Sequence, residues 1–221
     1  MTGNKEKQWR DKLEEIRQMK INIFGLFLER FEREQRNNIY QALEKLEIKE
    51  IPLVHIRDDM DKEELDLLFN KYKTRYFTIH EEHFNIIDKW QDFEKYLFLE
   101  MNTDNFIADN VRVEKIGGFC VDLAHYQKQK DRQTIDYNYI FERRHKQNLF
   151  KCNHLSGYSF KDMEDLHYAN SKKDFDYLKN LPDFVFGEVM AIEIDNSIKE
   201  QLKLGEYIVR LLGSSYCNII K

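Results

Sequence analysis

Nine side chains able to bind a metal ion lie at or after the ends of short apolar stretches of the sequence. They are five histidines, two aspartates and two glutamates: His55, His80, Glu100, Asp122, His125, His154, Asp165, His167 and Glu193. Imidazole mixed with carboxylate, without a thiolate, is typical of Zn²⁺, Mn²⁺ or iron sites rather than of Ca²⁺ or Mg²⁺ sites. Nine ligands exceed the needs of one ion. Two or three ions sharing a bridging carboxylate would use them, and clustered divalent ions favour in-line displacement at phosphorus.

The elements that must position these side chains are short apolar segments separated by longer amphipathic ones. The segments expected to form strands are residues 51–56, 75–80, 96–101, 118–123, 149–155 and 189–194. Most are nearly continuous apolar runs, as in parallel strands that are covered on both faces. The stretches between them are long enough for crossover helices. Two such helices are expected at residues 61–73, with Asp61 as N-cap, and at residues 197–212.

The N-terminal quarter is less regular than the rest. Helical spacing relates Trp9, Leu13, Ile16 and Met19. Residues 21–28 are a candidate strand, and residues 37–46 a candidate polar helix. The 221 residues then form one α/β domain, irregular over residues 1–48 and built of regular βα units over residues 49–221. We expect a compact or incomplete (β/α) TIM-type barrel, since such barrels use roughly 200 residues or more; an open doubly wound sheet is the alternative.

Six successive expected strands end in a metal-capable side chain. These are His55, His80, Glu100, Asp122, His154 and Glu193. In a parallel barrel the carboxyl ends of the strands converge on the face where catalytic groups are found. If the six side chains point inward, the residues two positions earlier form the layer beneath: Leu53, Thr78, Phe98, Cys120, Cys152 and Ala191. None of these six is charged, which favours the inward orientation.

Asp165 and His167 lie in the segment that follows His154, which we expect to be a loop. They are two residues apart, so an extended backbone would place both on one side. His125 follows Asp122 at a spacing of three residues. These three side chains add to the six at the strand ends.

The order of these residues resembles the endonuclease IV family of zinc-dependent abasic-site nucleases (AP endonuclease family 2), part of the xylose isomerase-like barrel superfamily. The matching text is VDLAH, FKCNHLSG and DLHYANSKKDF, and the resemblance covers about residues 50–195. It implies that Glu100 bridges two Zn²⁺ ions. It also implies that Asp122, His154 and Glu193 hold the pair with help from three histidines, His55, His80 and His125. Asp165 and His167 would then hold a third ion.

The reaction that the resemblance implies is the hydrolysis of a phosphate ester, with abasic DNA as the suggested substrate. A sugar isomerase or epimerase of the same superfamily is the main alternative, acting on a sugar or sugar phosphate. It would need one Mn²⁺-type ion held by four ligands, Glu100, Asp122, His154 and Glu193. Glu100 and Glu193 would then act as acid and base. A barrel without catalysis that serves as a binding protein is a third reading.

Charge and composition bear on location and partners. The 40 acidic residues outnumber the 35 basic ones and give a formal charge of −5, which argues weakly against a duplex-binding surface. Arg143, Arg144 and Lys146 are the local groups that could neutralise phosphate, but a solvated helix surface is the favoured interpretation of these residues. Three scattered cysteines, the charged start of the sequence and the lack of a long apolar stretch predict a cytoplasmic protein without membrane anchoring. The sequence does not indicate an oligomeric state.

Overall fold

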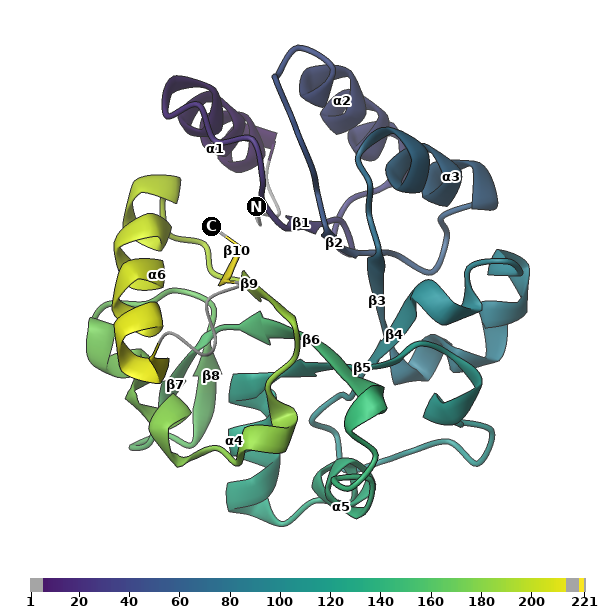
Figure 1. Ribbon diagram of the computed structural model, residues 1–221, viewed down its shortest axis with the longest axis vertical. Helices are drawn as coiled ribbons and strands as arrows, with labels where there is room; N and C mark the ends of the chain where they lie inside the picture. Colours follow the sequence, from purple (N-terminus) through teal and green to yellow (C-terminus); the bar gives the residue numbers. More distant parts are fainter. Residues whose placement is uncertain (1–5, 214–218, 221) are drawn as a thin grey trace.

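The computed structural model describes residues 6–213 and 219–220, and shows an α/β fold built on a curled parallel sheet (Figure 1). The strands of this sheet are β1 (Leu26–Phe27), β2 (Leu53–His55), β3 (Tyr76–His80), β4 (Leu97–Glu100), β5 (Gly118–Asp122), β6 (Phe150–Leu155) and β9 (Val189–Ile192), with the short β10 (Ile219–Ile220) beside β9. The sheet forms a half-barrel, which is compatible with the expected incomplete TIM-type barrel. Within the described residues no ladder joins β10 to β1.

The strands are paired in sequential order, β1-β2-β3-β4-β5-β6-β9-β10. A doubly wound sheet reverses its strand order at a switch point, so this alternative is wrong. The parallel register sets functional side chains on neighbouring strands next to each other: His80 is paired with Glu100, and Asp122 with His154. The pairing therefore brings metal-capable residues together before any loop contributes.

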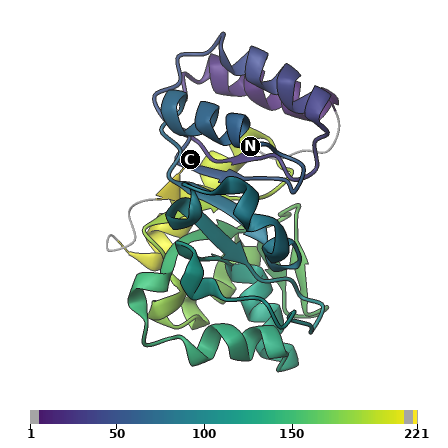
Figure 2. The same cartoon turned by 90° about the vertical axis from the view of Figure 1, so that its right-hand side faces the viewer.

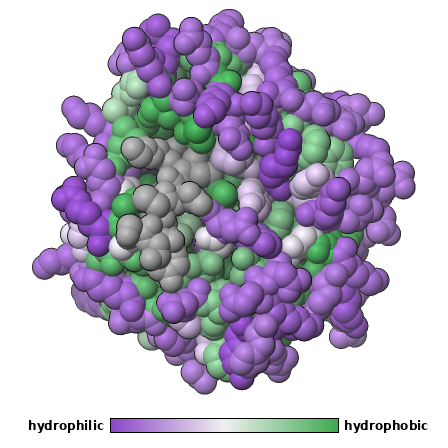
Figure 3. Space-filling model, viewed as in Figure 1, coloured by the Kyte–Doolittle hydropathy of each residue, from purple (hydrophilic) through white to green (hydrophobic). Residues whose placement is uncertain are grey.

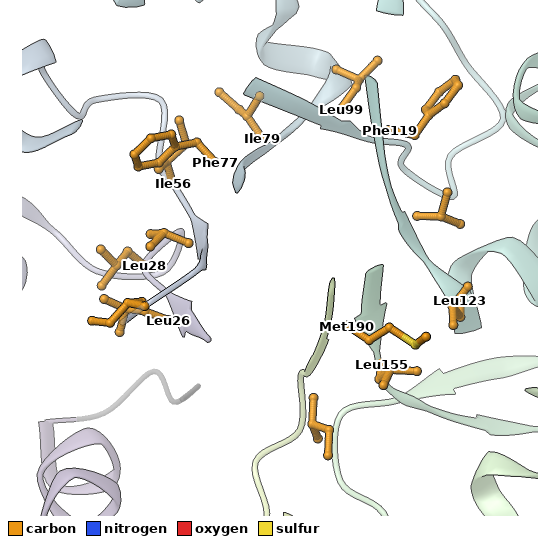
Figure 4. Packing of buried hydrophobic residues seen from close by; sticks show 14 of the residues in the cluster. Leu26, Leu28, Ile56, Phe77, Ile79, Leu99, Phe119, Leu123, Leu155 and Met190 are labelled. Atoms are coloured by element: carbon orange, nitrogen blue, oxygen red, sulfur yellow. The ribbon is translucent and has the colours of Figure 1, made fainter. Parts of the chain in front are cut away.

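Alternate residues of each strand separate the interior of the half-barrel from its outer face. Phe27, Leu53, Phe98, Cys120, Cys152 and Ala191 form one buried cluster inside the sheet. Leu26, Phe77, Leu99, Phe119 and Met190 belong to the main core and point away from the centre, toward the helices (Figure 4). Five of the six residues expected in the layer beneath the site lie in this inner cluster, which also contains Phe27. The sixth, Thr78, is also fully buried.

In the part of the chain that the structure describes, six α-helices surround the sheet on its outer side: α1 (Glu6–Gln18), α2 (Arg33–Leu43), α3 (Lys62–Lys71), α4 (Leu123–Arg132), α5 (Ile135–Glu142) and α6 (Ile198–Leu212). α1 contacts both α2 and α6, so the first helix lies beside the last one (Figures 1 and 2). Asp61 caps α3 as expected, because its side chain accepts a hydrogen bond from the Glu64 amide at 3.0 Å. Ser197 and Glu200 form a capping box at the start of α6.

The amphipathic pattern at the N-terminus is confirmed for three of its four residues. Trp9, Leu13 and Ile16 are buried in the core. Met19 is 42% exposed, because α1 ends at Gln18 and the chain turns away.

The expectation of regular βα units over residues 49–221 is wrong for three connections. The β3–β4 connection holds the 3₁₀ helices η1 (Glu81–Trp90) and η2 (Glu94–Tyr96), and the β4–β5 connection holds only η3 (Val113–Lys115). In η1 the buried residues Phe84, Ile87 and Trp90 recur every third position, which matches the three residues per turn of a 3₁₀ helix. The buried residues of this connection therefore do not show the 3.6-residue period of the α-helix that was expected there.

The third exception is the connection between β6 and β9, which we expected to contain a loop after His154. It forms an antiparallel hairpin of β7 (Gly157–Ser159) and β8 (Glu164–Leu166), followed by the 3₁₀ helices η5 (Lys172–Asn180) and η6 (Asp183–Val185). Another short 3₁₀ helix, η4 (Gln147–Leu149), precedes β6. In η5, Phe175 and Leu178 are buried three residues apart, as in η1.

The face of the molecule seen in Figure 3 is mostly hydrophilic at its periphery, with apolar residues nearer its middle. This distribution agrees with outer helices that turn charged sides to solvent. No helix among residues 6–213 combines the length and apolar character needed to span a membrane.

Candidate metal centre

The structure brings all nine predicted residues to one region at the carboxyl ends of the strands. His55, His80, Glu100 and Asp122 are the last residues of β2, β3, β4 and β5. His154 lies in β6, and Glu193 directly follows β9. His125 is on the first turn of α4, Asp165 is in β8, and His167 follows β8. Asp165 thus lies in a strand of the hairpin and His167 directly after it, rather than in the expected loop.

Glu100 lies at the centre of the arrangement. One set of ligand atoms within 4.8 Å of one another comes from Glu100, Asp122, His154 and Glu193, and another comes from Glu100, His55 and His80. Glu100 Oε2 is 2.8 Å from His154 Nδ1 and 3.7 Å from His55 Nε2. Its carboxylate is therefore shared by two neighbouring ligand sets.

A further set consists of His125, Asp165 and His167. Asp165 Oδ2 is 3.7 Å from His125 Nε2 and 3.3 Å from His167 Nε2. The other ring nitrogen of His125 is 3.5 Å from Glu100 Oε1, so this histidine lies between the third set and the central carboxylate. This differs from the ligand sets implied by the resemblance, which placed His125 with His55 and His80.

Buried polar atoms without hydrogen bonds are concentrated here, which tests whether the residues fit a metal ion. Both ring nitrogens of His55 lack a partner, as do Nδ1 of His80, His125 and His154 and Oε2 of Glu100. The His154 Nδ1 and Glu100 Oε2 atoms are 2.8 Å apart but do not have hydrogen-bond geometry. Unpaired buried polar atoms are costly. Lone pairs that converge without bonding to each other are suited to a shared cation, so the donor set fits divalent ions.

Burial and nearby charges shift the pKa values of the central residues in different directions. Burial alone would raise the pKa of Glu100, but His154, His80 and His55 hold it well below its usual range. Burial lowers the pKa of His55 to about 3, so its imidazole is neutral at pH 7. Burial raises the pKa of Asp122, whereas His154 overcomes burial and lowers the pKa of Glu193. The ionised Glu100 carboxylate beside the neutral His55 imidazole is the form that binds a metal ion. Burial would lower the pKa of His154, but Cys120, Glu100 and Glu193 raise it, so a metal ion bound by this ring would displace a proton.

In the third set, the acidic and basic side chains shift one another's pKa values. Burial would lower the pKa of His125, but Asp122, Asp165 and Glu100 raise it to about 10. Burial would raise the pKa of Asp165, but the nearby rings of His125 and His167 and the hydrogen bond from Lys128 lower it. The contact with Asp165 raises the pKa of His167. Without a metal ion, protons on the histidines therefore supply the positive charge that balances the carboxylates.

Neighbouring side chains orient several of these ligands. The Thr78 hydroxyl is 3.3 Å from His154 Nε2, which leaves Nδ1 of that ring facing Glu100 and Glu193. Asp122 caps α4 by accepting a hydrogen bond from the His125 amide at 2.9 Å. The three-residue spacing of Asp122 and His125 is thus also the spacing of a helix cap.

Sequence reasoning missed Glu29 and Lys128. Glu29 Oε2 is 3.5 Å from His55 Nδ1, and burial followed by the charge of Glu193 raises the pKa of Glu29 to about 7. It lies two residues after Phe27 of the inner layer, so the alternation used for the other strands could have found it. Lys128 donates a hydrogen bond to Asp165 at 3.0 Å, and its three-residue spacing from His125 was the available signal.

A small pocket lies beside this cluster. It is lined by Phe27, Glu29, Arg30, His167, Glu193, Ile194 and Asp195. Its volume of about 10 Å³ is enough for one water molecule. The pocket therefore offers a position for one water molecule next to two of the candidate ligands, His167 and Glu193.

The basic residues that we considered for phosphate binding lie elsewhere. Arg143 and Lys146 precede β6, at the opposite end of that strand from His154. Both pair with Glu114, at 2.9 and 3.0 Å, and Arg143 also lies over the Tyr139 ring. Arg144 stacks over Phe141. These contacts fit the alternative of a solvated helix surface.

Comparison of the chain with protein-family models, curated proteins and solved structures gives no match.

Proposed function

We propose that this protein is a metal-dependent hydrolase of phosphate esters, with two or three divalent ions held at the carboxyl ends of a xylose isomerase-like half-barrel. The observation that carries the proposal is the position of the Glu100 carboxylate, which two ligand sets share and the third set approaches through His125. One carboxylate shared between ligand sets is the arrangement of clustered divalent ions that act on phosphate esters. Zn²⁺ is the ion that suits the mixed imidazole and carboxylate donors.

Each ligand set has a distinct part in this proposal. Glu100 would be shared by two ions; Asp122, His154 and Glu193 would help to hold one of them, and His55 and His80 the other, since their ligand atoms lie within 4.8 Å of one another. His125, Asp165 and His167 would hold a third. Bound ions would supply Lewis acidity toward the phosphoryl oxygens and toward a water nucleophile.

The chain's own residues contribute orientation and charge. Thr78 fixes the ring of His154 from below, and Lys128 holds Asp165 toward His125 and His167. Arg30 is 44% exposed beside this pocket and pairs with Glu29 at 3.2 Å. A guanidinium at this position would bind a phosphate oxygen outside the pocket, which is too small for a phosphate group. Glu29 is placed to accept or release a proton at this pocket, since its pKa is raised to about 7.

Hydrolysis of two substrates with and without a chelator tests the proposal. We expect metal-dependent hydrolysis of bis(4-nitrophenyl) phosphate, and cleavage of an abasic-site oligonucleotide if DNA is the substrate. EDTA should abolish both activities, and Zn²⁺ should restore them. Cleavage of bis(4-nitrophenyl) phosphate alone would support phosphate-ester hydrolysis as the reaction and exclude abasic DNA as the substrate. No hydrolysis of any phosphate ester by the metal-loaded protein would contradict the proposal.

A sugar isomerase or epimerase is the second candidate, because four of its expected ligands form one compact set. Glu100, Asp122, His154 and Glu193 offer atoms that all lie within 4.8 Å of one another. This candidate leaves the set of His125, Asp165 and His167 without a role. One bound Mn²⁺ that survives a His167→Gln substitution, with isomerisation in a panel of aldoses and ketoses, would favour it over hydrolysis.

A further inference from the structure

A group of three carboxylates lies apart from the ligand sets described above. Glu81 directly follows β3, Asp104 lies in the β4–β5 connection, and Asp136 is in the first turn of α5. Each offers one carboxylate oxygen, and these oxygens lie within 4.8 Å of one another. Three segments that are distant in sequence thus direct acidic groups toward one point.

Asp136 shows that this group is more than a surface cluster of acids. Its residue is 0% exposed, and neither of its carboxylate oxygens has a hydrogen-bond partner. An unpaired carboxylate in the interior is strongly disfavoured unless a cation or a proton compensates it. The oxygens of Asp136 lie next to those of Glu81 and Asp104, so two more negative groups add to this cost.

The surrounding groups hold the carboxylates in place without neutralising them. The Asn102 amide donates to Glu81 Oε2 at 2.6 Å, and the Phe106 amide donates to Asp104 Oδ1 at 3.1 Å. Burial raises the pKa of Asp136, although its own backbone amide and the Thr134 hydroxyl act in the opposite direction, and the charge of Asp104 adds a smaller increase. Backbone amides thus position the oxygens of two of the three acids.

We propose that Glu81, Asp104 and Asp136 form a binding site for a hard divalent cation, with Ca²⁺ as the preferred ion. All three donors are oxygen atoms, and no imidazole or thiolate belongs to the set, which favours Ca²⁺ over Zn²⁺. Asp104 is exposed, so water can complete the coordination on that side. Ca²⁺ tolerates such irregular, partly hydrated coordination better than Mg²⁺ does.

This cation would act on the metal centre by positioning rather than by catalysis. Glu81 is joined to His80, and Asn102, whose amide binds Glu81, is two residues from Glu100. An ion at this site would fix the ends of β3 and β4, and with them two predicted ligands of the central set. Cation binding at this site does not depend on the proposed hydrolysis, so it can be measured without an activity assay.

Equilibrium dialysis of the full chain against Ca²⁺, with the main centre saturated with Zn²⁺, tests this proposal. We expect one equivalent of Ca²⁺ to be retained and the midpoint of thermal unfolding to rise with Ca²⁺ concentration. Asp136→Asn should lower the affinity for Ca²⁺ at least about tenfold, a loss typical of weakened metal sites. In EDTA the same variant should be at least as stable as the parent, because it removes an unpaired buried charge.

Three further variants locate the binding. Asp104→Asn changes an exposed member of the set and should also weaken Ca²⁺ binding, whereas Asp92→Asn, on an exposed residue paired with Lys62, should leave it unchanged. Glu100→Gln should leave Ca²⁺ retention intact, which separates this site from the main centre. The proposal is overturned if no Ca²⁺ is retained, or if retention is unaffected by Asp136→Asn and Asp104→Asn.

Discussion

Glu100→Gln is expected to lower metal-dependent phosphate-ester hydrolysis by at least about 100-fold. Substitution of residues that only hydrogen-bond to metal ligands already lowers metal affinity or activity about 10- to 100-fold, and Glu100 is itself a proposed ligand. Glutamine keeps the size of the side chain but loses the charge and one of the two oxygens that can bind an ion. The Glu100 side chain is only 2% exposed and lies between His55 and His154. Steady-state kinetics at saturating Zn²⁺ measure the effect.

Glu188→Gln is the matched control for this substitution. Glu188 precedes β9, is 58% exposed and pairs with Lys151, far along the strand from Glu193. It should retain the parent rate and metal content. Circular dichroism of both variants checks that they are folded. A Glu100→Gln protein that is folded and retains the parent rate would show that this carboxylate does not bridge ions.

Arg36→Met is expected to lower the free energy of unfolding by about 3–5 kcal/mol, the cost of breaking a buried ion pair. The Arg36 side chain is 0% exposed and binds Glu64 through two nitrogens, at 2.9 and 2.8 Å. It also donates to the Phe31 carbonyl and to Asp59, and Tyr40 donates to the same Glu64 carboxylate. These bonds join α2 to α3, and the substitution leaves Glu64 buried and without its main partner. Urea denaturation measures the change.

Arg33→Met provides the comparison on the same helix. Arg33 pairs with Asp61 at 2.7 Å, but its side chain is 67% exposed, so its loss should cost no more than about 1 kcal/mol. The double variant Arg36→Met with Glu64→Leu should be more stable than Arg36→Met alone, since both charges are then removed. Equal effects of Arg33→Met and Arg36→Met would contradict this account of the buried pair.

The sequence was sufficient to predict where six strands of the large sheet lie and which residues lie at their ends, because period and parity are local properties. Alternation along β4 and β5 places Phe98 and Cys120 in the inner layer and Glu100 and Asp122 above them. The cap at Asp61 follows from a spacing of three residues and is also local. Such features need only the residues of one element.

The remaining parts of the structure depend on contacts between distant segments. Phe84, Ile87 and Trp90 are apolar at a spacing that suits a 3₁₀ helix, but their burial is decided by the elements around them. Glu29 belongs to the site because the two-residue strand β1 pairs with β2; alternation through Phe27 points to Glu29, but it does not specify that pairing. The meeting of Glu81 with Asp136 depends on where α5 packs, which no single segment specifies.

The metal content of the purified protein tests the central claim most directly. Elemental analysis after dialysis against Zn²⁺ should give two or three equivalents per chain, and Glu100→Gln should lose at least two of them together, because its carboxylate is common to two ligand sets. His167→Gln should lose only the ion of the third set. A protein that binds no Zn²⁺ or Mn²⁺ under any condition, or that keeps its full complement without Glu100, would contradict the claim that these nine side chains form a metal centre.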